Sequence, residues 1–314
     1  MLADAKLTAY IPCYNVEAHV ESAIQALLRQ TRPPDEILII DDGSTDRTLE
    51  IASRHPVRVI RHGSNKGLAA ARNTAFLHAR CGLVAALDAD VAPSPDWLER
   101  LLEAFADPRV AGSGGRLIEK HTDTAADEWR ALQLSQDLGE TRIEIVWPSH
   151  KRLGGFGTIF RKEAVRQAGG YDESLSTNYE DVDMSERLLR ARHKLIFEPR
   201  AVAYHLRRDT LASVVRTAWR WNFWIHYRQG GYNNIWLKAL MNFRWARALM
   251  TQHVTSGRLR LLPIDAALPW KHTYWDLRYH FSSRRLPPGV AKGEVSAMYW
   301  PWPLRPLLRR YRGA

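Results

Sequence analysis

The sequence predicts an α/β fold in which helices flank a mostly parallel sheet, followed by a mainly helical C-terminal extension. Between Leu7 and Asp90, short apolar runs alternate with amphipathic stretches, which is the pattern of repeated β-α-β units. Past His205 the chain turns basic and rich in tryptophan. A composition of 45% hydrophobic and 25% charged residues over 314 positions excludes a disordered chain and a disulfide miniprotein.

The expected elements follow one another in a regular order. The apolar runs predict strands at Leu7–Ile11, Ile37–Ile40, Val57–Ile60, Leu83–Leu87 and, later in the chain, Thr158–Phe160. Helical spacing is found at Val20–Arg29, Asp46–Arg54 and Leu68–Arg80. Because a Ser hydroxyl can cap free amides and Pro suits the first turn, a further helix is expected to begin at Ser94 and to continue through Leu102.

Charge divides the chain into two regions. The formal charge is +11, but residues 1–204 carry 26 Lys and Arg against 30 Asp and Glu, whereas residues 205–314 carry 19 against 4. Nine of the twelve tryptophans lie between Trp219 and Trp302. We therefore expect two parts with different tasks, a first domain at 1–205 and a basic, Trp-rich helical extension at 206–314.

The sequence gives no sign of a membrane-spanning helix or a leader. No window offers the roughly 18 uninterrupted apolar residues that a span needs, and Met1–Pro12 lacks the charged start and apolar core of a signal peptide. We expect a cytoplasmic protein, at most peripheral at the inner face of the cell membrane. Cys13 and Cys81 are expected to be buried, reduced thiols, because two isolated cysteines make no disulfide framework.

Acidic clusters follow the second and the fourth predicted strands. Asp41 and Asp42 come directly after one, and Asp88 and Asp90 come directly after the other. In a doubly wound sheet, ligands bind beyond the carboxyl ends of the strands. An Asp-x-Asp triplet leaving a strand sends two carboxylates to one side, where they can share a divalent cation with phosphate oxygens. A single such Asp is more commonly a turn residue or a helix cap, but two clusters favour transfer chemistry with a nucleotide-linked donor.

Cations that suit a diphosphate stand before the Asp-x-Asp triplet. Lys66 and Arg72 lie near the start of a predicted helix, where backbone amides and positive charge favour phosphate, although solvated charges at a helix start would look the same. The phosphate-loop pattern GxxxxGK[ST] is absent, and Gly112–Gly115 does not form GxGxxG before a helix. A P-loop NTPase and a nicotinamide dehydrogenase are therefore poorly supported.

Taken together, the motifs resemble the family 2 glycosyltransferases, which have the Rossmann-like GT-A fold. The resemblance covers about Leu7 to His205 and is carried by the runs 11–15 (IPCYN), 41–46 (DDGSTD), 65–73 (NKGLAAARN), 88–90 (DAD), 154–161 (GGFGTIFR), 169–173 (GGYDE) and 179–183 (YEDVD). It implies a catalytic domain that binds a UDP-, GDP- or dTDP-linked sugar.

The resemblance also implies roles for individual residues on the donor side. Pro12, Asp42 and Lys66 line the nucleoside pocket, and Asp88 addresses the ribose or the diphosphate. Asp90 binds the metal, Mn²⁺ or Mg²⁺. His205 stands where some relatives supply a further metal or phosphate contact, and a structural histidine is the competing interpretation. The other residues expected at the donor are Asn15, Asp41, Gly67 and Arg72.

On the acceptor side, the resemblance makes Asp181 the catalytic base. The residues agree, because Glu180, Asp181 and Asp183 begin a helical run whose first turn favours negative charge, although ordinary capping explains acids there as well. Glu180, Gly155 and Phe156 are expected to contact the acceptor, while the glycines at 154, 155 and 157 fit tight turns equally well.

The predicted reaction is a single, inverting displacement onto a hydroxyl of a glycan or of a lipid-linked acceptor, in cell-surface polysaccharide or glycolipid synthesis. Double displacement needs a second carboxylate as nucleophile, and the sequence singles out none. A polyprenyl-phosphate glycosyltransferase is the alternative enzyme. An inactive scaffold is a further alternative, against which the intact Asp42, Asp90 and Asp181 argue.

The C-terminal extension allows several partners. Its aromatic and basic helices, around 219–228 and 235–245, suit an anionic membrane surface. They also suit packing on the first domain or on a second copy in a homodimer. A single-strand nucleic-acid surface combines the same residue types, but no RNP, KH or zinc pattern supports it, so we expect no nucleic-acid partner.

Overall fold

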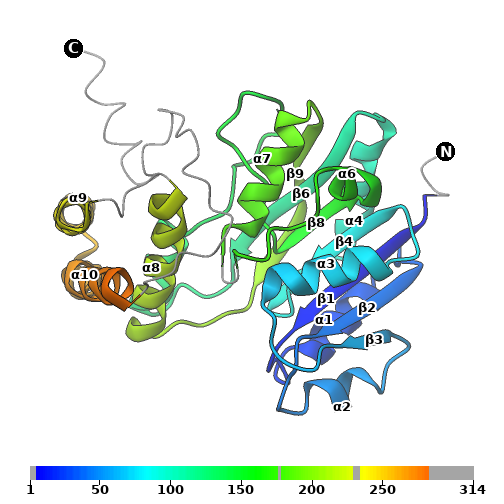
Figure 1. The fold of residues 1–314 in the computed structure, drawn as a ribbon, viewed down its shortest axis with the longest axis horizontal. Coiled ribbons are helices and arrows are strands. Elements are labelled where there is room, and N and C mark those ends of the chain that lie inside the picture. Colours follow the sequence, from blue (N-terminus) through cyan, green and yellow to red (C-terminus); the bar gives the residue numbers. More distant parts are fainter. Residues whose placement is uncertain (1–4, 176–177, 229–233, 283–314) are drawn as a thin grey trace. The chain divides into compact units, whose positions relative to one another are not determined.

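The computed structural model describes residues 5–175, 178–228 and 234–282 (Figure 1). The predicted extension beyond 282, with Trp302, lies outside these residues. The described chain forms two compact units. The first comprises the residues up to Lys120 together with Gln136–Arg207, and the second comprises His121–Ser135 and the residues from Arg208 onward.

The first unit is built on one mixed sheet, in the order β3-β2-β1-β4-β8-β6-β9-β5 with β7 beside β9 (Figure 1). Its strands are β1 (Leu7–Cys13), β2 (Glu36–Asp41), β3 (Arg58–Arg61), β4 (Leu83–Leu87), β5 (Val91–Pro93), β6 (Val110–Glu119), β7 (Ile143–Ile145), β8 (Gly157–Arg161) and β9 (Lys194–His205). The first four strands pair in parallel, as predicted, and β8 runs antiparallel between β4 and β6.

Helices cover both faces of the sheet because side chains alternate along each strand. Leu7, Ala9 and Ile11 of β1 pack into one core, whereas Tyr10 between them packs into the other. The first core includes residues of α1 (Val20–Leu28), α2 (Thr48–Ala52) and α4 (Trp97–Leu102), and the second includes residues of α3 (Leu68–His78), α6 (Lys162–Gln167) and α7 (Glu180–Arg190). A 3₁₀ turn, Glu103–Ala106, follows α4.

The predicted strands are confirmed within two residues at each end, and the helices α1, α2 and α3 are found where expected. The predicted start at Ser94 is wrong, because α4 begins at Trp97 and no side chain caps it. The backbone N–H of Ser94 donates to the carbonyl of Val202 in β9, and its hydroxyl donates to Asp96. Pairing with the sheet therefore replaces the expected cap. Cys13 and Cys81 are free and buried, as predicted.

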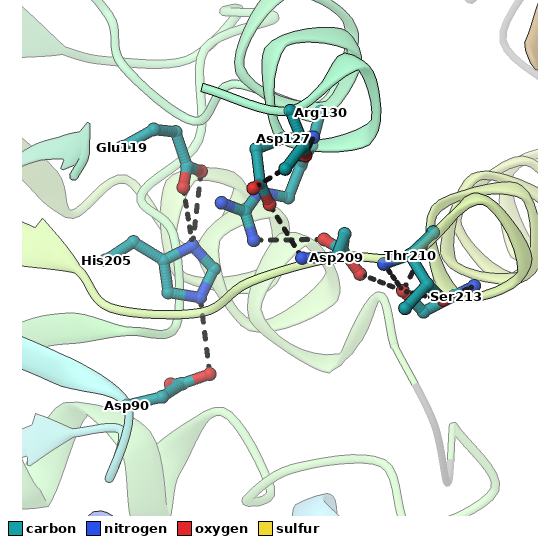
Figure 2. A network of polar contacts seen from close by, with 9 residues as sticks. Asp90, Glu119, Asp127, Arg130, His205, Asp209, Thr210 and Ser213 are labelled. Atoms are coloured by element: carbon teal, nitrogen blue, oxygen red, sulfur yellow. Dashed lines mark hydrogen bonds and ion pairs between the residues drawn. The ribbon is translucent and has the colours of Figure 1, made fainter. Parts of the chain in front are cut away.

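The second unit is helical. Its helices are α5 (Ala125–Gln133), α8 (Leu211–Arg228), α9 (Ile235–Thr255) and α10 (Leu262–Ser282), with a 3₁₀ turn at Leu259–Leu261. Buried polar contacts join α5 to the segment before α8. Arg130 forms a buried ion pair with Asp209 (3.0 Å), and Asp127 accepts the backbone N–H of Asp209 (Figure 2). Among the described residues, no helix is long and apolar enough to cross a membrane.

Candidate active site

The carboxyl ends of β1, β2 and β4 meet at one edge of the sheet. Cys13 at the end of β1 lies beside Asp41 at the end of β2, and β4 pairs on the other side of β1. The chain passes outward from β1 to β2 and β3 and then returns to β4, so the strand order reverses at β1. Open α/β sheets bind ligands at such a reversal. All four acidic residues predicted from the strand ends lie at this edge.

Asp42 organises the loop that precedes α3. Its Oδ1 accepts the backbone N–H of Lys66 (2.8 Å) and contacts Nδ1 of His62 (2.7 Å), and its Oδ2 accepts the N–H of Gly67 (2.8 Å). Gly67 has a φ of 94°, which favours glycine, and α3 begins at the next residue. Asp42 is buried and the Lys66 side chain is exposed. Asp42 therefore fixes the backbone that presents Lys66.

Two further residues predicted at the donor hold neighbouring loops together. Asp41 is fully buried, accepts the N–H of Ser44 (3.0 Å) and forms an ion pair with Arg61 (3.2 Å). Asn15 donates its N–H to the Ser44 hydroxyl (3.0 Å) and accepts the N–H of Thr45 (2.8 Å). The loop after β1 is thereby joined to the loop after β2. Pro12, the last residue but one of β1, is half-buried.

The Asp-x-Asp triplet follows β4, and its second carboxylate contacts His205 at the end of β9. Nε2 of His205 lies 3.3 Å from Asp90 Oδ2, and its Nδ1 lies 3.0 Å from Glu119 Oε2 (Figure 2). Burial alone would lower the pKa of His205, but the hydrogen bonds to the two carboxylates raise it to about 9. Burial would likewise raise the pKa of Asp90, and the hydrogen bond from His205 outweighs it and lowers that pKa.

The donor atoms around Asp90 fit a hard divalent cation that shares its ligands with phosphate. Asp88 Oδ1 is buried and has no hydrogen-bond partner among the described residues. Burial raises the pKa of Asp88 to about 6, and the nearby Arg72 limits the rise. No cluster of three metal-ligating side chains is found in the described part of the chain. One or two carboxylates with substrate phosphates are the usual ligand set for Mg²⁺, so the arrangement is compatible with such an ion.

Arg72 joins the donor side of the site to α7. It lies in α3 and is only 1% exposed. Its Nε donates to Glu180 Oε1 (3.2 Å), its Nη1 donates to the Tyr10 hydroxyl (3.1 Å), and its Nη2 lies 3.5 Å from Asp88 Oδ1. The idea that Arg72 is a solvated charge at a helix start is therefore wrong. Its guanidinium is an interior junction between residues that are far apart in sequence.

Asp181 lies in the first turn of α7, where the sequence placed it. Its Oδ2 accepts the N–H of Gly155 (2.8 Å), and the next residue, Phe156, accepts the N–H of Asp88 through its carbonyl (3.0 Å). A Cβ on Gly155 would lie 2.5 Å from Arg72 Nη2, so this position has space only for glycine. Its φ is not positive, so close approach rather than a tight turn explains this glycine. The segment 155–156 thus links Asp88 to Asp181.

Tyr179, which precedes α7, adopts a φ of 81°. Such a conformation is rare for a bulky residue and is most often found where a site requires it. The buried side of the helix anchors it, because Met184, Leu188 and Leu189 are inaccessible to solvent. The helix start is therefore held from one side by packing and from the other by the contacts of Arg72 with Glu180 and of Gly155 with Asp181.

Glu180 has an unusual pKa for a carboxyl group. Burial and the neighbouring charge of Asp181 raise it from 4.5 to about 7, and Arg72 opposes the rise. A raised pKa means that the folded state holds more protons than the unfolded chain between these two pH values, so stability falls as pH rises from about 4.5 to about 7.

We expect the Glu180→Gln variant to lack this part of the pH dependence. The difference in unfolding free energy between wild type and variant should change by about 3 kcal/mol over that range, from the pKa shift alone. Urea unfolding of both proteins at a series of pH values between 4.5 and 8 measures it. A difference that stays constant with pH would show that Glu180 titrates normally.

Three residues of the site were not predicted, and of these only Tyr10 carries no clear signal in the sequence. Tyr10 has the apolar surroundings of a core strand, yet its hydroxyl accepts from Arg72. His62 follows β3 directly and bridges Asp42 to Thr74, and Glu119 ends β6 beside His205. His62 and Glu119 lie at strand ends, so the rule that led to the Asp clusters also applies to them. Among the predicted residues, contacts connect Asp88, Arg72, Glu180, Asp181 and Gly155 directly.

The fold is the GT-A fold, a mostly parallel α/β sheet with acidic residues at the carboxyl ends of its strands. A model of the family described as glycosyl transferase family 2 matches residues 8–169. The chain belongs to this family.

Two curated relatives illustrate the likeness. The chain is 33% identical over 180 residues to the pre-mycofactocin glycosyltransferase of Mycobacterium tuberculosis, covering 56% of the chain and 38% of that protein. It is 26% identical over 228 residues to the poly-beta-1,6-N-acetyl-D-glucosamine synthase of Staphylococcus epidermidis, covering 71% of the chain and 53% of that protein. The chain thus spans about half or less of the length of these relatives.

Solved structures confirm the GT-A fold. The mannosyltransferase PcManGT from Pyrobaculum calidifontis, in complex with GDP-Man and Mn²⁺, matches with a TM-score of 0.55 at 19% identity, over 91% of this chain and 78% of that chain. TarS 1-349 of S. aureus, in complex with UDP-GlcNAc, matches with a TM-score of 0.53 at 18% identity, over 65% of this chain and 59% of that chain.

Proposed function

We propose that this protein transfers a sugar from a nucleoside-diphosphate sugar to a hydroxyl of a glycan or of a lipid-linked acceptor, by one inverting displacement. The observation that carries the proposal is the junction around Arg72. It connects a carboxylate of the Asp-x-Asp triplet, Asp88, to the start of the helix that holds Asp181. A site built in this way holds donor-side and acceptor-side carboxylates a fixed distance apart, as an in-line displacement needs.

Each residue of the candidate site has a proposed role in the transfer. The loops fixed by Asp41, Asp42 and Asn15 receive the nucleoside, and Lys66 and the start of α3 favour its diphosphate. Asp181 accepts the proton of the acceptor hydroxyl as that oxygen attacks the anomeric carbon. Asp90 and His205 would hold Mn²⁺ or Mg²⁺, which when bound neutralises charge on the departing diphosphate. Glu180, Gly155 and Phe156 border the acceptor, in our proposal.

The relatives indicate the general class of acceptor. One is named as the synthase of a polysaccharide, and the other as a glycosyltransferase of pre-mycofactocin. Glycan or glycolipid synthesis is therefore the proposed process for this chain. We assign the first 205 residues to donor binding and catalysis, and residues 206–314 to contacts with acceptor, membrane or a second copy.

A panel of UDP-, GDP- and dTDP-linked sugars tests the donor site. One nucleotide family should raise the melting temperature of the wild-type protein in the presence of Mn²⁺ or Mg²⁺. Chelation should remove most of this stabilisation and the transfer activity, and either ion should restore both. The Asp90→Asn variant should lose the metal-dependent part, whereas Leu77→Ala on the exposed side of α3 should behave as wild type.

Two results would contradict the proposal. If no nucleotide sugar stabilises the protein in either metal, the donor assignment fails. If transfer is full in chelator, the assignment of a metal to Asp90 and His205 fails while the donor assignment stands.

A further inference from the structure

Helices α9 and α10 differ from a usual surface helix. Their buried side mixes apolar residues, among them Leu249, Ile264 and Leu268, with polar ones, and their exposed side carries large apolar residues. Six polar side chains face inward and are at most 3% exposed: Lys238, Asn242, His253, Asp265, His272 and Asp276. Seven large apolar or aromatic side chains face outward and are at least 38% exposed: Trp236, Leu237, Leu240, Phe243, Trp270, Tyr274 and Phe281. We call these seven residues the aromatic face. In water, both placements carry a cost in free energy.

The buried polar contacts fix the helices in this orientation. Lys238 Nζ donates to Asn242 Oδ1 (2.7 Å), and Asn242 Nδ2 donates to Asp276 Oδ2 (2.8 Å), across the two helices. Trp219 of α8 donates to the other oxygen of Asp276 (2.8 Å). Rotating either helix to hide its aromatic residues would break this network and leave buried partners unpaired. The buried polar contacts therefore determine that the aromatic face is the exposed side of the two helices.

The aromatic face is continuous over both helices. Trp236, Leu240 and Phe243 follow the spacing of one side of a helix, and Trp270, Tyr274 and Phe281 do the same on α10. The two stripes meet where the rings of Phe243 and Trp270 pack edge to face, with centroids 5.0 Å apart. A contiguous exposed patch of this kind marks an interaction surface, unlike single apolar residues scattered over a protein.

Every exposed charge on these two helices is positive. Arg244, Arg247, Lys271 and Arg278 are exposed, whereas the only acids in the two helices, Asp265 and Asp276, are buried. The chain beyond α10 adds seven Lys and Arg against Glu294 alone. Cations beside Trp, Tyr and Phe match the headgroup region of an anionic bilayer, where the rings lie at the boundary between headgroups and acyl chains.

The same observations argue against other occupants. A second copy would bring like charges together, because a two-fold interface places the same patch on both sides. A single-strand nucleic-acid surface combines the same cations and rings, but the sequence has no RNP, KH or zinc pattern. We propose that the aromatic face of α9 and α10 docks the protein on an anionic lipid surface, lying on the bilayer without crossing it. This inference goes beyond the proposed transfer reaction and does not depend on it.

Co-flotation of the full chain with vesicles tests the proposal. Wild type should float with phosphatidylcholine vesicles that contain phosphatidylglycerol, and much less with phosphatidylcholine alone. The Trp236→Ala/Trp270→Ala variant should partition at least about 100-fold less, because it lacks two rings that would enter the bilayer. The Arg244→Gln/Lys271→Gln variant should bind anionic vesicles about 30-fold less, from roughly 1 kcal/mol per cation. Added salt should weaken wild-type binding.

The controls separate docking from folding and from self-association. All four substituted side chains are exposed, so the variants should keep the wild-type melting temperature. Leu77→Ala, which removes an equally exposed apolar side chain from α3, should float as wild type does. The proposal is overturned if wild type stays in solution with anionic vesicles, or if the Trp variant floats undiminished. It is also overturned if the Trp substitutions instead dissociate a dimer of the wild type or abolish the binding of the wild type to an oligonucleotide.

Discussion

The Asp181→Asn variant is expected to bind donor as wild type does and to transfer sugar about 10²- to 10⁴-fold more slowly, which is the usual contribution of a general base. An Asn oxygen can still accept the N–H of Gly155, which holds the side chain in wild type at 2.8 Å. The substitution therefore removes the ability to accept a proton and gives up one local contact, because the Asn nitrogen cannot accept the N–H of Val182 as Asp181 Oδ1 does (2.8 Å). Turnover with saturating donor and acceptor, together with donor titration by calorimetry, measures the two effects separately.

A carboxylate further along α7 serves as the matched control. Glu186 forms ion pairs with the exposed Arg190 (2.7 Å) and with Arg152 (4.0 Å), and Gln keeps an oxygen that can accept from an Arg, so Glu186→Gln should leave turnover near normal. Near-normal turnover of Asp181→Asn onto a hydroxyl acceptor would refute the assignment of the base. Activity of the variant on a polyprenyl phosphate, together with no activity of the wild type on hydroxyls, would favour a polyprenyl-phosphate glycosyltransferase. A phosphate oxygen already lacks its proton and needs no base.

The first half of the fold follows from periodicity. Strands β1 to β4 have short apolar runs that alternate between two cores, and each of the first three is followed by a helix with a polar turn before it. The later strands are less evident, because β6 contains the glycines 112, 114 and 115. At each of them an added Cβ would come within about 3 Å of a neighbouring atom, so close packing rather than strand propensity selects these residues.

The candidate site was predictable where its residues follow strands or belong to a motif, and not where they meet through the interior. Asp42 and Asp90 follow strands, whereas Asp181, in the first turn of α7, was selected from the resemblance of the motifs. The contact of Arg72 with Glu180 joins residues 108 apart in sequence, and nothing local in either segment encodes it. The same holds for the exposed side of α9 and α10. The helical spacing of these segments is visible in the sequence, but the choice of which side is buried depends on the partners of Asp276 and Asp265.

Replacing Arg72 by Met is expected to destabilise the protein by about 3–5 kcal/mol, the usual result of removing one partner from a buried ion pair. The guanidinium is 1% exposed, and without it Glu180 and Asp88 lose a neutralising charge while the Tyr10 hydroxyl loses a donor. Arg72→Lys should recover only part of the loss, because one ammonium cannot form the three directed contacts. Denaturant unfolding at pH 8, where Glu180 of the wild type is mostly ionised, measures the effect.

A double variant decides whether the loss arises from the unpaired carboxylate. If the charge left on Glu180 is the main cost, Arg72→Met/Glu180→Gln should be more stable than Arg72→Met alone, since Gln carries no charge. The same reasoning predicts that Arg72→Met loses less stability at pH 5 than at pH 8, because protonation then neutralises Glu180, whose pKa is about 7. Arg80→Met, which removes an exposed partner of Glu36 in the same unit, should cost less than about 1 kcal/mol. An equal loss of stability in Arg72→Met and Arg80→Met would contradict the role of Arg72 as the junction. The segment 155–156 would then be the link between Asp88 and the start of α7.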